Sequence, residues 1–230
     1  MEAKKPKIKF FGHSFFQVSF GRVKFLIDPL VYNYSSKYVP LLNPTVSVDK
    51  LDGVDAIFIT HEHLHHFDKK AIEEITRKNN CIVVGHHSVL NELKIAPNYL
   101  KPITNGSKFN LKGVDVTITS VHHPNAFYPV GYLLEKDGTS IFHAGDTQLI
   151  DKFIEKSPDV ALFPIGGNNS MDLIDAVRAT KSMKPKMVIP MHYNTFEHIK
   201  ADAKDFALRI NKSNVKTKPI ILKPGKGFNL

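Results

Sequence analysis

Four histidines fall within six residues of this 230-residue chain, in the stretch Thr60-His61-Glu62-His63-Leu64-His65-His66-Phe67-Asp68. Imidazole is the commonest protein ligand for zinc and for similar borderline metals. A chance run of histidines is expected at a terminus or in a low-complexity tract, whereas this run follows an apolar stretch and precedes a helical pattern. The spacing therefore predicts a metal site at residues 61–66.

Three further groups of polar residues also follow apolar stretches. His122 and His123 follow residues 117–120, Asp146 follows a hairpin strand and Gly145, and His192 follows residues 187–190. The carboxyl ends of strands are where α/β folds gather their sites. Each residue alone has an ordinary structural explanation, such as a capping aspartate. Their order along the chain instead favours one metal centre, in which Asp146 could bridge two cations.

The elements that must position these residues alternate between strand meanders and strand-helix units. In the first half we expect strands at residues 8–11, 15–20, 23–27, 54–60 and 81–85, and helices after Asp68 to residue 79 and at about 87–95. In the second half we expect strands near 107–111, 114–121, 129–136, 139–143, 160–164, 187–190 and 218–222, and helices at 149–156, 171–183 and 196–211. This order indicates an α/β fold of two sheets flanked by helices.

The composition is that of a folded protein with a sizeable core, with 42% hydrophobic and 23% charged residues. Lys and Arg exceed Asp and Glu by 31 to 22, and the basic residues are mostly lysine, which lacks the fork that reads phosphates and guanine edges. The positive charge suits anionic substrates or nucleic acid, and solubility alone explains it equally well. One cysteine, Cys81, and no run long enough to span a membrane favour a cytoplasmic protein. We expect a single domain over residues 1–230, with an internal pseudo-duplication near residue 113.

Five further segments carry a family resemblance together with His61-x-His63-x-x-His66. They are Gly12-His13-Ser14-Phe15-Phe16, Ile27-Asp28-Pro29, His143-Ala144-Gly145-Asp146-Thr147, Pro164-Ile165-Gly166-Gly167 and Ile189-Pro190-Met191-His192-Tyr193-Asn194-Thr195-Phe196. In their order and in their residues, these motifs resemble those of the metallo-β-lactamase superfamily. Within it they are similar to the small metal-dependent hydrolases related to L-ascorbate-6-phosphate lactonase. The resemblance covers residues 8–222 and implies a four-layer αβ/βα sandwich of two mixed sheets flanked by helices.

By position, the resemblance implies a first metal held by His61, His63 and His122, and a second held by His66 and His192, with Asp146 bridging. His65 departs from the family motif, which has an aspartate that ligates the second metal and touches the attacking water. A neutral imidazole there leaves a two-metal site one unit more positive. Three readings stay open: His65 is still a ligand, the site holds one metal, or catalysis is lost and a metal-dependent binding protein remains.

The activity that the resemblance implies is hydrolysis, in which a metal-activated water attacks an ester, lactone or phosphoester bond of a small, anionic substrate. Asp146 and His65 would act at the reaction centre. The expected cofactor is one or two Zn²⁺ ions per chain, with Mn²⁺, Fe²⁺ or another divalent ion as alternatives. A nuclease or phosphodiesterase acting on nucleic acid is the second hypothesis, but the basic residues do not cluster with aromatic ones as they do in nucleic-acid grooves.

Several polar residues near these motifs have two interpretations. Asp28 and Asp68 are candidates for carboxylates that orient ligand imidazoles, with a helix N-cap as the alternative for Asp68. His86 and His87 are interpreted as capping and surface residues, while His13 and His143 suit either the site or the core. Within the pair 122–123, His122 has the better spacing after Ser120 and is the expected ligand.

Overall fold

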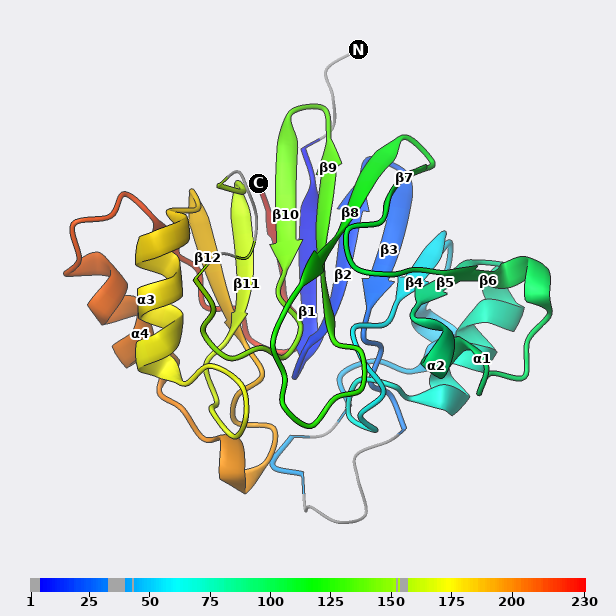
Figure 1. Cartoon of the computed structure of the whole chain (residues 1–230), viewed down its shortest axis with the longest axis horizontal. Helices are drawn as coiled ribbons and strands as arrows, with labels where there is room; N and C mark the ends of the chain where they lie inside the picture. Colours follow the sequence, from blue (N-terminus) through cyan, green and yellow to red (C-terminus); the bar gives the residue numbers. More distant parts are fainter. Residues whose placement is uncertain (1–4, 33–39, 43, 152, 154–156) are drawn as a thin grey trace. The chain divides into compact units, whose positions relative to one another are not determined.

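The structure is a computed structural model, and it describes residues 5–32, 40–42, 44–151, 153 and 157–230. The chain divides into two compact units (Figure 1). Unit 1 comprises Met1–Thr104, Ala126–Tyr128 and Lys223–Leu230, and unit 2 comprises Asn105–Asn125 and Pro129–Leu222. The expectation of one domain over residues 1–230 stays a prediction.

Unit 1 is built on a seven-stranded mixed sheet in the order β14-β1-β2-β3-β4-β5-β6. The strands β14, β1, β2 and β3 pair in antiparallel fashion, and β3 to β6 are parallel. Parallel strands are covered on both faces, which suits the continuously apolar, fully buried β4. The bounds are β1 Lys7–Gly12, β2 Phe15–Phe20, β3 Val23–Ile27, β4 Ala56–Phe58, β5 Ile82–Gly85, β6 Leu100–Pro102 and β14 Gly227–Asn229.

Two helices belong to unit 1, α1 (Lys69–Asn79) and α2 (His87–Leu90), together with the 3-10 turns η1 (Val48–Lys50) and η2 (Pro97–Tyr99). Helix α1 begins where the Asp68 side chain accepts a hydrogen bond from the Ala71 amide, at 3.1 Å, so the predicted N-cap is confirmed. Its apolar face places Ile72 and Ile75 in one core cluster with Ile57 of β4. This packing fixes the start of α1, and therefore the end of the loop that carries the histidines.

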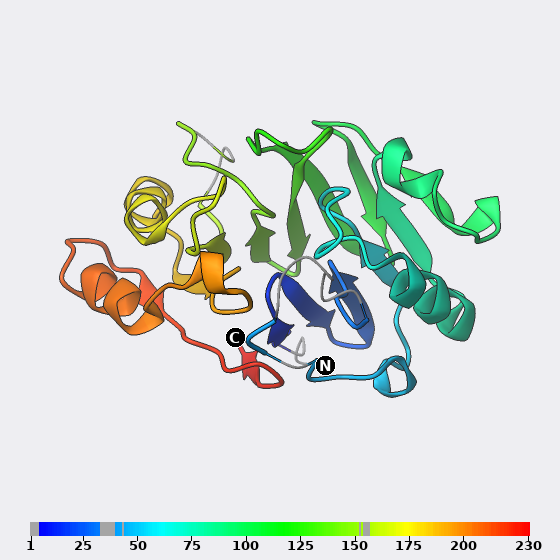
Figure 2. The ribbon, with the colours of Figure 1, turned by 90° about the horizontal axis from the view of Figure 1, so that it is seen from below.

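Unit 2 repeats the same plan with a second seven-stranded mixed sheet, in the order β13-β12-β11-β10-β9-β8-β7. Strands β7 to β10 are antiparallel and β10 to β13 are parallel. The bounds are β7 Lys108–Leu111, β8 Val114–Ser120, β9 Val130–Lys136, β10 Thr139–His143, β11 Val160–Pro164, β12 Met187–Met191 and β13 Lys218–Pro219. Helices α3 (Leu173–Met183) and α4 (Ala203–Asn211) lie side by side (Figure 2), and the 3-10 turn η3 (Glu197–Ile199) precedes α4.

Two of the predicted helices are shorter than expected. The helix predicted over residues 196–211 was wrong at its start, because Asp202 accepts hydrogen bonds from the Lys204 and Asp205 amides and caps a helix that begins only at Ala203. The helix predicted at 87–95 ends at Leu90, since the amides of Glu92 and Leu93 bond to carbonyls only three residues back.

Two further segment predictions need correction. In the segment 149–156, residues 149–151 and 153 are not helical, and the other residues lie outside the described residues. Leu149, Ile150 and Phe153 instead pack in the core of unit 2. The strand predicted at 218–222 is confined to Lys218–Pro219, and β6 and β14 were not anticipated.

The predicted α/β class is confirmed, because each of the two mixed sheets is accompanied by helices. Among the described residues, no helix is both long and apolar enough to cross a membrane.

Candidate metal centre

The histidine loop, residues 61–66, joins β4 to the N-terminus of α1 in unit 1. One ring nitrogen from each of His61, His65 and His66 lies within 4.8 Å of the others. The Nε2 atom of His61 also lies 3.1 Å from Nδ1 of His63. Both His61 and His66 are buried, so their rings are held by packing as well as by hydrogen bonds. The loop therefore brings together all four histidines that the sequence analysis singled out in it.

One buried carboxylate, that of Asp28, orients two of these imidazoles. Asp28 Oδ2 accepts a hydrogen bond from His66 Nδ1 at 2.7 Å and from the Thr60 hydroxyl at 2.6 Å, and Oδ1 accepts from the Thr60 amide at 2.8 Å. The donation from His66 Nδ1 places the lone pair of that ring on Nε2. The interpretation of Asp28 as an orienting carboxylate agrees with this geometry.

Thr60 extends the influence of Asp28 to His61. A hydroxyl has a single proton, and Thr60 gives it to the acceptor-only carboxylate, so Thr60 Oγ1 accepts from His61 Nδ1 at 2.9 Å. The lone pair of His61 therefore also lies on Nε2. One negative charge thus sets the tautomers of two neighbouring rings in the form that binds a metal.

His13 joins the same group from the β1–β2 turn. Its ring centroid lies 5.0 Å from that of His65 and 5.1 Å from that of His66, and ring nitrogens of these three residues lie within 4.8 Å of one another. His13 has a φ of 55°, a conformation unusual for a residue other than glycine. The sequence analysis left His13 between the core and the site, and the structure places it beside the histidine loop.

Unit 2 contributes a second pair of candidate ligands. His192, directly after β12, places Nε2 2.9 Å from Oδ2 of Asp146, and both side chains are buried. Near Asp146, His143 Nδ1 accepts a hydrogen bond from the Gly145 amide at 3.0 Å, which shapes the turn after β10. Next to His192, burial raises the pKa of Tyr193, so its phenol stays protonated at neutral pH. The structure therefore pairs the predicted bridging carboxylate with a predicted histidine ligand.

The neighbouring residues His122 and His123 differ in their surroundings. His122 is exposed, whereas His123 is buried at 6% exposure. The His123 Nδ1 donates to the Asn169 carbonyl at 3.0 Å, which leaves the lone pair on Nε2, the arrangement usual for a metal-binding histidine. The sequence favoured His122 for its spacing after Ser120, whereas in the structure the alternating burial of β8 already becomes irregular after Ile118.

Two other expectations concerned capping residues in unit 1. His86 is the N-cap of α2, where its Nδ1 accepts from the Ser88 amide at 3.4 Å, as the capping interpretation predicted. Asp68, besides capping α1, accepts from the amides of Val31 at 2.9 Å and Tyr32 at 2.5 Å. Through these hydrogen bonds Asp68 connects the segment that follows Asp28 to α1, the helix that comes directly after the histidine loop.

The donors of each unit fit a borderline divalent metal, because unit 1 offers several imidazoles, unit 2 pairs an imidazole with a buried carboxylate, and hydrogen bonds support rings in both. The supporting contacts are Asp28 on His66, Thr60 on His61 and the Asn169 carbonyl on His123. A histidine that merely packs in a core requires no such set of neighbours with matched tautomers.

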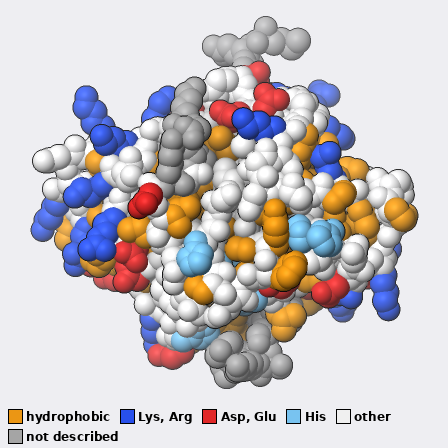
Figure 3. Space-filling model, in the orientation of Figure 1, with side chains coloured by type: hydrophobic (Ala, Val, Ile, Leu, Met, Phe, Trp, Pro, Cys, Tyr) orange, Lys and Arg blue, Asp and Glu red, His pale blue; other side chains and the backbone are white. Residues whose placement is uncertain are grey.

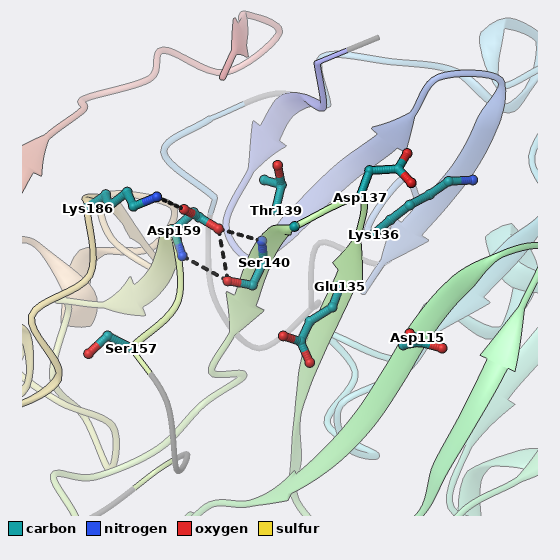
Figure 4. Close-up of a pocket in the computed structure, with 10 residues that line it drawn as sticks. Asp115, Glu135, Lys136, Asp137, Thr139, Ser140, Ser157, Asp159 and Lys186 are labelled. Atoms are coloured by element: carbon teal, nitrogen blue, oxygen red, sulfur yellow. Dashed lines mark hydrogen bonds and ion pairs between the residues drawn. The ribbon is translucent and has the colours of Figure 1, made fainter. Parts of the chain in front are cut away.

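A cavity of about 330 Å³ lies elsewhere in unit 2 (Figure 4). It is at the amino ends of β11 and β12, whereas Asp146 and His192 follow the carboxyl ends of β10 and β12. In it, Asp159 binds Lys186 Nζ at 2.6 Å and accepts from the Ser140 amide at 2.7 Å. Burial alone would raise the pKa of Asp159, but the contacts with Lys186 and Ser140 lower it. The cavity is therefore separate from the candidate ligands of unit 2.

Comparisons with known proteins give a consistent family assignment. Residues 7–192 match the family model described as a beta-lactamase superfamily domain. The chain is 36% identical to a UPF0173 metal-dependent hydrolase of Staphylothermus marinus, over 96% of this chain and 97% of the relative. It is 34% identical to another of Pyrococcus furiosus, over 97% and 99%.

A solved structure supports the same assignment at the level of the fold. A metallo hydrolase of Ignicoccus hospitalis is similar, with a TM-score of 0.83, 29% identity and 98% coverage of both chains.

Proposed function

This chain belongs to the metallo-β-lactamase superfamily and to its metal-dependent hydrolases, and from that premise we propose that it hydrolyses an ester, lactone or phosphoester bond of a small anionic substrate. The observation that carries the proposal is the control of two imidazole tautomers by the Asp28 carboxylate, at 2.7 Å from His66 and, through Thr60, on His61. Histidines that bind a metal almost always donate their second ring N–H in this way, which leaves the lone pair of the other ring nitrogen for the metal.

We propose as metal ligands His61, His63, His66, Asp146 and His192, as the family resemblance implies. For the remaining imidazole we propose His123 in place of His122, because His123 is the buried one with an oriented ring. A divalent ion, Zn²⁺ in our proposal, supplies an acidified water and polarises the substrate oxygen when it is bound.

The residues of this chain prepare that chemistry through orientation and charge. The buried rings of His61 and His66 keep one tautomer each, so they need no rearrangement when the ion enters. His65 stands where the resemblance places an aspartate, and we propose that it is a ligand. The site then lacks one negative charge relative to that pattern, which favours an anionic substrate.

A nuclease is the second candidate that the family allows. Lysine and arginine side chains occur in separate groups among the described residues drawn in Figure 3. Since backbone phosphates are held by contiguous basic grooves with aromatic residues, this face favours the small-molecule proposal. Retention on RNA that falls steeply with salt would support the nuclease instead.

The test is the metal content per chain of tag-free protein, measured by elemental mass spectrometry for the wild type, His65→Asp and His65→Ala. We expect about two metals in the wild type and a fall toward one in His65→Ala, together with hydrolysis of a lactone or a phosphodiester. About one metal in both, rising to two only in His65→Asp, would replace the two-metal proposal with a mononuclear enzyme. A metal-loaded chain that hydrolyses neither class would contradict the hydrolase proposal.

A further inference from the structure

Two exposed apolar side chains lie at the histidine loop. Among the described residues, the two most exposed large hydrophobic side chains are Phe127 at 73% and Leu64 at 58%. Leu64 is part of the loop itself, between His63 and His65. Single exposed hydrophobic residues are ordinary on protein surfaces, but a pair beside a candidate metal centre is typical of a ligand contact.

A hydrogen bond to the loop fixes the backbone of Phe127. Its amide donates to Oε1 of Glu62 at 2.6 Å, and Glu62 lies between two of the proposed ligands. The segment Ala126–Tyr128 belongs to unit 1, although the residues on both sides of it belong to unit 2. Prolines at 124 and 129 restrict the chain before and after it. The contact with a carboxylate is of the stronger, charge-assisted kind, so Phe127 is held beside the histidine loop.

The neighbouring Tyr128 is fixed by ring stacking. Its ring lies 3.9 Å from that of His86, with an angle of 8° between the planes. Burial, and then the neighbouring His87, lower the pKa of His86, so this imidazole is neutral at pH 7 and stacks as an uncharged ring. Because His86 also caps α2, the stack connects the segment 126–128 to the rigid part of unit 1.

The ordered backbone at Phe127 and the exposure of its ring together favour the binding of an apolar ligand group. Leaving a phenylalanine side chain in water forgoes the favourable free energy of burying it. The contacts at Glu62 and His86 order the segment without covering the Phe127 ring. An ordered, uncovered aromatic ring binds an apolar ligand group with little loss of conformational entropy.

We propose that Phe127 and Leu64 bind an apolar aryl or alkyl group of the substrate. The inference rests on the proposed function and narrows its substrate class. The hydrolysed compound is then amphiphilic: the ester, lactone or phosphoester group lies at the metal ligands, and an apolar group lies against Phe127. Water adds across the scissile bond to give an acid and an alcohol, which stay joined as one hydroxy acid when the substrate is a lactone, and the apolar group stays on the product that carries it.

The first test measures binding without catalysis. The chain has no tryptophan, so Phe127→Trp introduces a single fluorescent reporter at the proposed surface. Leu208→Trp is the matched control, because Leu208 is an exposed hydrophobic residue (49%) of α4 in unit 2. We expect phenylacetate to change the emission of the Phe127→Trp variant saturably and acetate to leave it unchanged, with no response from the control. No response of the Phe127→Trp variant to phenylacetate, or an equal response of both variants, overturns the inference.

The second test compares substrate pairs that differ only in an apolar group. Suitable pairs are γ-butyrolactone with γ-nonalactone, and methyl 4-nitrophenyl phosphate with bis(4-nitrophenyl) phosphate. We expect Phe127→Ala to lower kcat/KM about tenfold for the more apolar member and less than about twofold for the other, with Leu208→Ala near wild type for both.

The results distinguish failure of the apolar contact at Phe127 from failure of the hydrolase activity itself. Hydrolysis of a pair with equal losses for both members overturns the inference alone. Hydrolysis unaffected by Phe127→Ala also overturns it. A metal-loaded wild type that hydrolyses no member of either pair overturns the proposed function, and the inference with it.

Discussion

Replacing Asp28 by asparagine removes the negative charge that orients the histidine loop while preserving the shape of the side chain. Three donors point at the Asp28 carboxylate, at 2.8 Å from the Thr60 amide, 2.6 Å from the Thr60 hydroxyl and 2.7 Å from His66 Nδ1. Asparagine has one acceptor oxygen. If that oxygen keeps the Thr60 amide, its NH₂ group faces the Thr60 hydroxyl and His66.

The expected size of the effect follows from this geometry. Facing a donor, His66 Nδ1 must accept, so its proton moves to Nε2 and the lone pair is lost from the proposed metal-binding atom. The Thr60 hydroxyl is no longer obliged to accept from His61, so the second ring loses its tautomer control as well. Loss of a group that orients one ligand costs about 10–100-fold in metal affinity. Because Asp28 governs two rings, we expect about 100-fold, or about 2.8 kcal/mol.

The assay is a metal titration against a chromophoric chelator, with circular dichroism to check that each variant is folded. Asp159→Asn is the matched control, because Asp159 also accepts hydrogen bonds from a backbone amide and a hydroxyl, those of Ser140, but lies away from Asp146 and His192 in unit 2. A folded Asp28→Asn protein with wild-type metal affinity would refute the reasoning. An equal loss of affinity in Asp159→Asn would do the same.

Three more predictions concern unit 2. We expect His123→Ala to weaken metal binding at least about tenfold and His122→Ala less than about twofold in the same titration; the reverse order would restore the ligand that the sequence favoured. Asp159→Asn should lower the free energy of unfolding by about 1–2 kcal/mol at pH 7. Because the pKa of Asp159 is lowered in the fold, this difference is present above pH 3.8 and disappears as the pH falls through the lowered pKa, which urea unfolding at several pH values would reveal. A Cβ atom on Gly166 would lie 2.9 Å from the Ile199 Cβ and would clash with the His192 carbonyl. The variant Gly166→Ala should therefore lower both the thermal midpoint of unfolding and the metal content. Wild-type values for both would show that the backbone moves to accommodate the methyl group.

Sequence reasoning succeeded where a side chain acts on its own segment. Asp68 caps α1 through the amide three residues ahead, and burial alternates along much of β2 and β8, one strand from each meander. It failed where a side chain distant in the sequence accepts the hydrogen bond of a backbone amide. The Lys94 amide, for example, donates to Glu73 at 2.8 Å, which diverts the chain from the helix expected to continue to residue 95.

Some residues of the candidate site could likewise be predicted from the sequence, and others could not. The four histidines of the loop were evident from their density in the sequence. The resemblance of the surrounding motifs to a metalloenzyme family predicted that they bind a metal. The choice between His122 and His123 was not accessible, since it depends on the Asn169 carbonyl, which is distant in the sequence. The placement of Phe127 was equally hidden, because nothing local to residues 126–128 indicates a contact with Glu62.

The pairing of β14 with β1 has a consequence for synthesis on the ribosome. Lys7 pairs with Asn229 and Lys9 with Gly227, and the Gly225 amide donates to the Phe10 carbonyl. One edge of β1 therefore stays open until residues 227–229 have been made, and an unpaired strand edge is a template for association with other chains. We expect the nascent protein to depend on chaperones until residue 229 has emerged, long after the histidine loop has been synthesised.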